Sequence, residues 1–213
     1  MNIERAKKCF KNHKATFTDY GNIKILDFKN PNSCEFRIRF MFEEDYCRLH
    51  ISGDLGELIA CNYNNMTYEK FARDFVNDTG YFEGKIQCIS RKLYTYDIDD
   101  AEEDLKKYIL ERYETLEAFV GLELQPYSSY DEDEGIPKEV VEEELDVFFS
   151  EVLRDYDEDD NAHTLSQAGL DALNEHIYTE WEEVQEFGKR RSDILDWYML
   201  AFSLAQEDLK VSV

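Results

Sequence analysis

The first third of the chain alternates between apolar and polar side chains with the period of two that is typical of β-strands. Runs of this kind stand at 15–19, 22–28, 36–41, 46–52 and 57–63. Turn sequences such as Tyr20-Gly21-Asn22 separate neighbouring runs, which is typical of hairpins. The pattern therefore predicts an antiparallel β-meander, with a short helix at 2–12 before it.

Apolar residues recur at helical spacing over much of the chain from residue 68 onward, so most of its elements are expected to be helices. Residues 85–90 fit either a short helix or a strand, and residues 94–96 are expected to be extended. Thr67 is a good N-cap for a first helix at 68–77. Longer helices are expected at 99–121, at 138–156 and, from a Thr164–Gln167 capping box, at 165–177 with a continuation to 187. A last helix at 192–208 is apolar on nearly every face, which is typical of a helix in a core or an interface.

The balance of acidic and basic residues changes at nearly the same place in the chain as the spacing of the apolar residues does. Residues 1–92 carry 15 Lys/Arg against 13 Asp/Glu, whereas residues 93–213 carry 9 against 35, a net charge of −26. We therefore expect an α+β protein in two parts. Residues 1–95 would form the antiparallel β-meander with short helices, and residues 96–213 would form an acidic helical C-terminal part.

The acidity is the main indication of function. An acidic run usually serves only to keep a helical surface soluble. A net charge of −24 is larger than solubility requires, and its field repels phosphate and attracts basic surfaces. We therefore expect the chain to bind a basic, nucleic-acid-binding protein and neither nucleic acid itself nor a membrane.

The expected binding surface lies on the acidic helices and the loops between them. Its acidic members are Asp131, Glu132, Asp133, Glu134, Glu142, Glu143, Asp155, Asp157, Glu158, Asp159 and Asp160. Three tyrosines among them could anchor the contact, because Tyr is enriched at interface hot spots: Tyr127, Tyr130 and Tyr156.

Motifs for metal binding and catalysis fail the test of spacing. The acidic segment 131–142 misses the calcium-binding EF-hand pattern because Gly135 stands at its fifth place and not its sixth. The four histidines lack the three- or four-residue spacing of paired ligands, and the five cysteines contain no Cys-x-x-Cys pair. We expect no metal, no cofactor and no enzymatic activity. A small enzyme with a site of distant carboxylates is an alternative that the sequence leaves open.

Two further patterns bear on location and on the sheet. No window approaches the ~20 apolar residues of a membrane-spanning helix, and residues 1–8 lack the apolar run of a secretory signal, so we expect a cytoplasmic protein. Arg37, Arg39 and Arg48 alternate with aromatic residues. We interpret these arginines as outward-facing strand positions, which could also pair with the acidic half of the chain.

Residues 36–75, particularly 46–58 and 64–71, resemble small uncharacterised proteins encoded by phages and prophages of Gram-positive bacteria. Size, acidity and the lack of a catalytic signature are also similar to the anti-CRISPR class of phage inhibitors, several of which present carboxylates to the nucleic-acid groove of a Cas effector. The resemblance implies an inhibitor in the cytoplasm of a bacterial host cell that blocks the nucleic-acid channel of a Cas9-like nuclease or another nucleic-acid-handling protein. The alternative is a non-inhibitory assembly module in which the helix at 192–204 forms a homodimer seam.

Overall fold

The chain divides into two compact units in the computed structural model, which describes residues 2–126, 135–156 and 165–211. Unit 1 combines Met1–Leu93 with Ser192–Val213, and unit 2 is the continuous segment Tyr94–Arg191. The expected α+β class, with an N-terminal antiparallel meander and a helical part after it, is confirmed. The division differs from the expected one because the C-terminal helix belongs to the unit with the sheet and not to the acidic unit.

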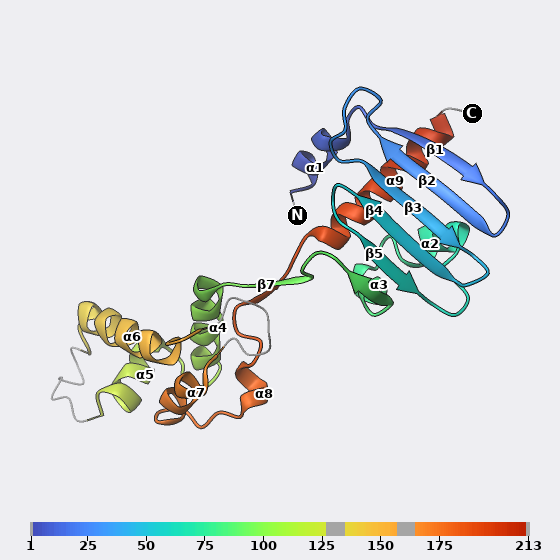
Figure 1. Cartoon of the computed structure of the whole chain (residues 1–213). Helices are drawn as coiled ribbons and strands as arrows, with labels where there is room; N and C mark the ends of the chain where they lie inside the picture. Colours follow the sequence, from blue (N-terminus) through green and yellow to red (C-terminus); the bar gives the residue numbers. More distant parts are fainter. Residues whose placement is uncertain (1, 127–134, 157–164, 212–213) are drawn as a thin grey trace. The chain divides into compact units, whose positions relative to one another are not determined.

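Unit 1 is built on a six-stranded antiparallel sheet whose strands neighbour one another in chain order (Figure 1). The strands are β1 (Lys14–Asp19), β2 (Ile23–Lys29), β3 (Ile38–Glu43), β4 (Arg48–Gly53), β5 (Leu58–Cys61) and β6 (Ile86–Ile89). Three short helices accompany them: α1 (Ile3–Phe10), α2 (Tyr68–Asp74) and α3 (Thr79–Glu83). The meander thus follows the period-two pattern. The segment at 85–90, whose sequence fits either a helix or a strand, contains the sixth strand, β6.

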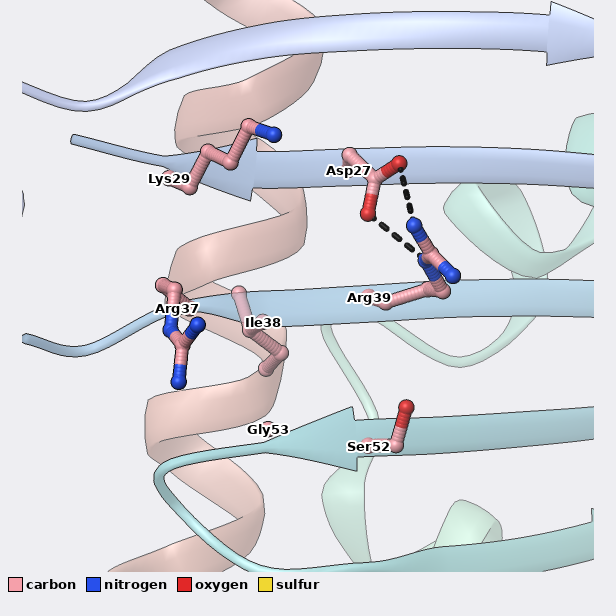
Figure 2. Close-up of a pocket in the computed structure, with 7 residues that line it drawn as sticks. All are labelled: Asp27, Lys29, Arg37, Ile38, Arg39, Ser52 and Gly53. Carbon is pink, nitrogen blue, oxygen red and sulfur yellow. Dashed lines mark hydrogen bonds and ion pairs between the residues drawn. The ribbon is translucent and has the colours of Figure 1, made fainter. Parts of the chain in front are cut away.

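One face of the sheet carries Arg37 and Arg39, two of the arginines noted in the sequence (Figure 2). Arg39 donates two hydrogen bonds to Asp27, at 2.7 and 3.0 Å, and these bonds raise the pKa of the Arg39 guanidinium. Arg37 lies 3.4 Å from Asp54. The arginines therefore face away from the core, as expected. Arg37 and Arg39 pair with carboxylates of unit 1, Asp54 and Asp27.

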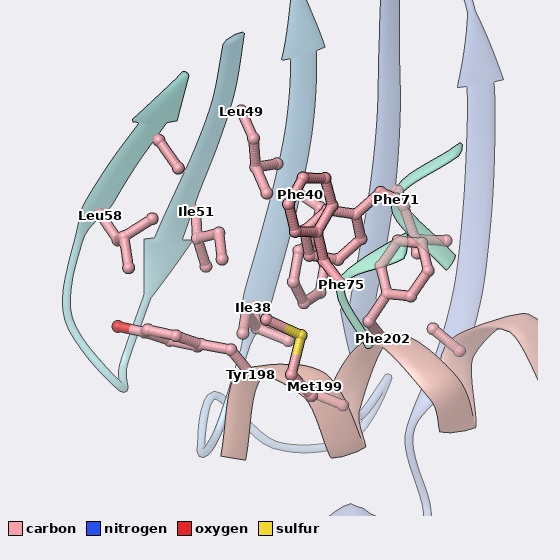
Figure 3. Close-up of a cluster of buried hydrophobic side chains, with 14 of the residues drawn as sticks. Ile38, Phe40, Leu49, Ile51, Leu58, Phe71, Phe75, Tyr198, Met199 and Phe202 are labelled. Atoms are coloured by element: carbon pink, nitrogen blue, oxygen red, sulfur yellow. The ribbon is translucent and has the colours of Figure 1, made fainter. Parts of the chain in front are cut away.

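The opposite face of the sheet holds the core of unit 1, which helix α9 (Ile194–Val211) covers (Figure 3). Side chains at alternate positions of β3, β4 and β5, such as Phe40 and Leu49, are buried there. From the helix, Phe202 places its ring 5.2 Å from Phe40 and 4.9 Å from Phe71 between centroids. The all-round apolar character of this helix is therefore explained by burial inside its own unit.

Unit 2 is a group of helices that stands, along the chain, between two short strands, β7 (Tyr94–Tyr96) and β8 (Lys189–Arg191). These two strands pair with each other. Between them lie α4 (Ile98–Leu110), α5 (Leu116–Phe119), the π-helical turn η1 (Val120–Leu124), α6 (Lys138–Val152), α7 (Gln167–Asn174) and α8 (Trp181–Val184). A second core of aromatic and aliphatic side chains, separate from that of unit 1, joins these helices.

Two of the expected long helices are interrupted. The helix predicted at 99–121 ends at Leu110, and a new one starts after Thr115, whose side chain accepts a hydrogen bond from the Ala118 N–H. The helix predicted to run through 177 ends at Asn174, whose side chain accepts a hydrogen bond from the Thr179 N–H in the following turn. The helical spacing of apolar residues continues across both breaks, so it does not reveal them. The helices end and begin there because polar side chains cap the backbone N–H groups.

Candidate protein-binding surface

The negative charge follows the two units more closely than it follows the two halves of the sequence. Unit 2 holds 31 Asp/Glu against 8 Lys/Arg, a net charge of −23. Unit 1, with the C-terminal helix included, holds 17 against 16, a net charge of −1. Nearly all of the net charge therefore lies on one compact helical unit.

Helix α6 presents a row of carboxylates to solvent. Its buried positions recur at helical spacing, so the positions between them face outward. The exposed acidic residues are Glu139, Glu142, Glu143, Asp146 and Glu151. Lys138 lies 3.3 Å from Glu142, and Arg154 lies 3.9 Å from Glu151. Within the described ranges, Glu143 and Asp146 take part in no salt bridge, so their charges are available to a partner.

A groove of about 390 Å³ runs between helices α4 and α6. Carboxylates of Asp99, Glu102 and Asp146 line it together with the apolar side chains of Phe149 and Leu153. Lys106 of α4 already pairs with Glu102, and its Nζ lies 5.3 Å from the centroid of the Phe149 ring. Asp99 and Asp146 form no salt bridge among the described residues, so these two carboxylates of the α4–α6 groove are available to the charged head of a partner's Lys or Arg.

A second acidic pocket, of about 280 Å³, lies between helices α4 and α8. The Tyr108 hydroxyl lies 2.7 Å from the Glu183 carboxylate, and its hydrogen bond lowers the pKa of Glu183. The Arg112 guanidinium carbon stands 3.7 Å from the centroid of the Tyr108 ring. Tyr108 and Arg112 already bind the Glu183 carboxylate. This pocket therefore offers fewer unpaired carboxylates to a partner than the α4–α6 groove does.

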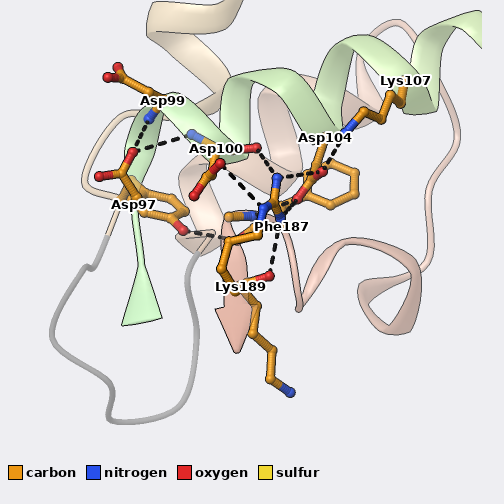
Figure 4. Close-up of polar contacts among 10 residues, drawn as sticks. Asp97, Asp99, Asp100, Asp104, Lys107, Phe187 and Lys189 are labelled. Carbon is orange, nitrogen blue, oxygen red and sulfur yellow. Dashed lines mark hydrogen bonds and ion pairs between the residues drawn. The ribbon is translucent and has the colours of Figure 1, made fainter. Parts of the chain in front are cut away.

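A polar cluster holds α4 against β8 (Figure 4). Arg190 donates to both carboxylate oxygens of Asp104, at 2.6 and 3.0 Å, and the Gly188 N–H donates to one of them at 3.0 Å. Burial opposes ionisation of Asp104, but the hydrogen bonds from Arg190 and Gly188 outweigh it and leave the pKa of Asp104 below its ordinary value. This carboxylate therefore stabilises the unit.

The structure covers only part of the predicted surface. Ten of its residues lie outside the described ranges: Tyr127, Tyr130, Asp131, Glu132, Asp133, Glu134, Asp157, Glu158, Asp159 and Asp160. Glu142 and Glu143 are exposed on α6, and Asp155 is exposed just after it in the left-handed conformation, at φ 59°.

Tyr156 has a structural role in addition to any contact with a partner. Its side chain is half-buried, and its hydroxyl donates a hydrogen bond of 2.9 Å to the Phe187 carbonyl. The sequence prediction had placed it on the surface because acidic residues surround it in the chain.

Sequence reasoning did not single out Asp99 and Asp146 as members of the surface. Their exposure was visible in the helical period, since both stand at polar positions of their helices. That they line one groove depends on the packing of α4 beside α6, which no local pattern indicates.

Comparison with known proteins identifies no relative: no family model, no curated protein and no solved structure matches this chain. In the ranges that the structure covers, no three or more His, Cys, Asp or Glu side chains are grouped so that they could hold a metal ion. No described helix is long and apolar enough to cross a membrane.

Proposed function

We propose that the chain is a protein inhibitor that uses the acidic surface of unit 2 to block the nucleic-acid-binding channel of another protein. A Cas9-like nuclease of a phage's bacterial host is the partner class that the sequence resemblance suggests. The observation that carries the proposal is the concentration of a net charge of −23 in one compact unit, beside a unit of net charge −1.

Nucleic-acid channels are lined with Lys and Arg that neutralise phosphates. A competitor must offer carboxylates on an ordered surface, because only an ordered surface holds its charges opposite those of the channel. Helix α6 and the α4–α6 groove meet this requirement, with Glu143 and Asp146 exposed and outside any salt bridge of the described residues. Complementary charge of this kind mainly raises the rate of association and fixes the choice of partner.

The alternative function, an assembly module with a dimer seam on the C-terminal helix, loses its main support. The apolar positions of α9 that suggested a seam, including Leu195, Tyr198 and Phe202, are buried against the sheet of unit 1. The sequence feature is thus explained without a second copy of the chain.

The test uses the full-length chain, a purified Cas9-like nuclease and two double variants of equal charge change. Glu143→Lys with Asp146→Lys alters α6, and Glu57→Lys with Glu207→Lys alters exposed carboxylates of unit 1. We expect the wild type to inhibit DNA cleavage, and we expect the α6 variant to bind about tenfold more weakly, which corresponds to about 1.4 kcal/mol. The unit 1 variant should bind nearly as the wild type does.

The dependence of the association rate on salt concentration distinguishes binding by the acidic surface from binding by apolar contacts. The Debye length is about 10 Å at 0.1 M salt, so added salt should slow association of the wild type and have less effect on the α6 variant. Equal weakening by both double variants, or an affinity that salt does not change, would refute the use of the acidic surface. Absence of both binding and inhibition would refute the partner class.

A further inference from the structure

A pocket of about 390 Å³ lies in unit 1, between helix α1 and the connection from β2 to β3. Arg5, Lys8 and Cys9 line it from the helix, at positions i, i+3 and i+4 that share one helical face. Glu35 and Phe36 line it from the connection. Its volume lies in the range of small-molecule sites.

His13 also lines this pocket and leaves one ring nitrogen unused. The side chain is only 5% exposed, and its Nε2 lies 3.1 Å from the Phe36 carbonyl oxygen. A carbonyl oxygen only accepts hydrogen bonds, so Nε2 carries a proton, and in the tautomer with its proton on Nε2 the Nδ1 atom is an acceptor. Among the buried side-chain nitrogen and oxygen atoms of the described residues, this Nδ1 alone has no partner. An unpaired buried acceptor costs free energy and calls for an explanation.

The backbone of Phe36, whose carbonyl holds the His13 ring, has an unusual conformation. Its φ is 56°, in the left-handed region that non-glycine residues seldom adopt. Packing holds it there, since its ring stacks on Trp197 with centroids 5.9 Å apart and an interplanar angle of 7°. Strained residues of this kind concentrate at ligand-binding and catalytic sites.

The charge of the pocket indicates the class of ligand. Arg5 and Lys8 are exposed and form no salt bridge within the described part of the chain. Glu35 is the one acidic residue among the side chains that line the pocket. The two cations attract an anion, whereas Nδ1 of His13, in the tautomer with its proton on Nε2, requires a hydrogen-bond donor.

We propose that this pocket binds a small phosphate monoester. Its anionic oxygens would accept hydrogen bonds from Arg5 and Lys8, and a hydroxyl of its organic part would donate one to Nδ1 of His13. A phosphate monoester carries a charge of about −1.5 to −2 near neutral pH, more than a single carboxylate does, so it matches the two cations of the pocket better. Glu35 can accept a hydrogen bond from a hydroxyl of the organic part. Reaching the buried Nδ1 requires the side chains over it to move apart.

The test follows the His13 ring by NMR in the full chain labelled with ¹⁵N-histidine, with ribose 5-phosphate as the probe and ribose as its phosphate-free control. We expect ribose 5-phosphate to shift the Nδ1 signal of His13 in a saturable manner and ribose to leave it unchanged. Binding should also protect the Cys9 thiol from alkylation, measured by peptide mass spectrometry, while the exposed Cys88 reacts as before.

Two neighbouring lysines of α1 provide a matched pair of variants. Lys8 lines the pocket and Lys7 does not, although both are exposed. Lys8→Gln should weaken binding about tenfold, as expected for loss of a charge-assisted hydrogen bond, and Lys7→Gln should change it little. An unshifted Nδ1 signal at millimolar probe would overturn the site, as would equal effects of both variants. Equal binding of inorganic phosphate would overturn the assignment to an organic ligand.

Discussion

Replacing Gly188 with alanine should destabilise unit 2 far more than the same change at Gly135. Both glycines adopt positive φ, at +76° for Gly188 and +68° for Gly135, so alanine meets a similar backbone penalty of about 1 kcal/mol at each. Their surroundings differ. A Cβ on Gly188 would stand 2.1 Å from the Tyr156 hydroxyl oxygen and 2.5 Å from the Asp97 carbonyl oxygen, whereas no atom of the described residues lies within 4 Å of one on Gly135.

The additional cost at Gly188 comes from two contributions. Tyr156 must move and lose its hydrogen bond to the Phe187 carbonyl, a net loss of about 1 kcal/mol. Overpacking against the Asp97 backbone adds about 1–3 kcal/mol. We expect a total of about 3–5 kcal/mol for Gly188→Ala and about 1 kcal/mol for Gly135→Ala. With a urea m-value of about 2 kcal/mol/M, the two variants should differ in midpoint by about 1–2 M.

Tryptophan fluorescence can report this effect for one unit at a time. The chain has two tryptophans, Trp181 in unit 2 and Trp197 in unit 1. In a Trp197→Phe background, the urea transition followed by fluorescence therefore reports unit 2. Equal midpoint shifts for the two glycine variants would refute the close packing of Tyr156 and Asp97 around Gly188.

Two further predictions use the same reporters. Phe202→Ala should destabilise unit 1 by about 3–5 kcal/mol, because it empties the fully buried ring site between sheet and helix, and Trp197 fluorescence in urea should show this. Asp104→Asn should destabilise unit 2 at pH 7 by about 1–3 kcal/mol. The pKa of Asp104 is lowered on folding, so its contribution is complete above the unfolded pKa of about 3.9 and is lost as pH falls through the folded value. The variant should therefore show a weaker loss of stability below about pH 4 than the wild type.

Local patterns in the sequence determined much of this protein. The period of two indicated the five strands from β1 to β5, because alternate side chains of a strand that is buried on one face must differ in polarity. The exposure of Glu142 and Glu143 followed from the apolar spacing of their helix. Charge is additive along a chain, so its concentration after residue 93 was visible without any structure.

Tertiary structure alone decided how distant segments meet. The apolar sequence of the C-terminal helix fits either a buried core helix or a dimer interface. Only its packing on the sheet shows that unit 1 is made of two separate stretches of chain. Arg190 and Asp104 form their ion pair across 86 positions, and Asp99 and Asp146 line one groove from two helices. Periodicity reports which face of an element is buried, but it does not report which other element covers that face. That choice depends on the fit of side chains from distant parts of the chain.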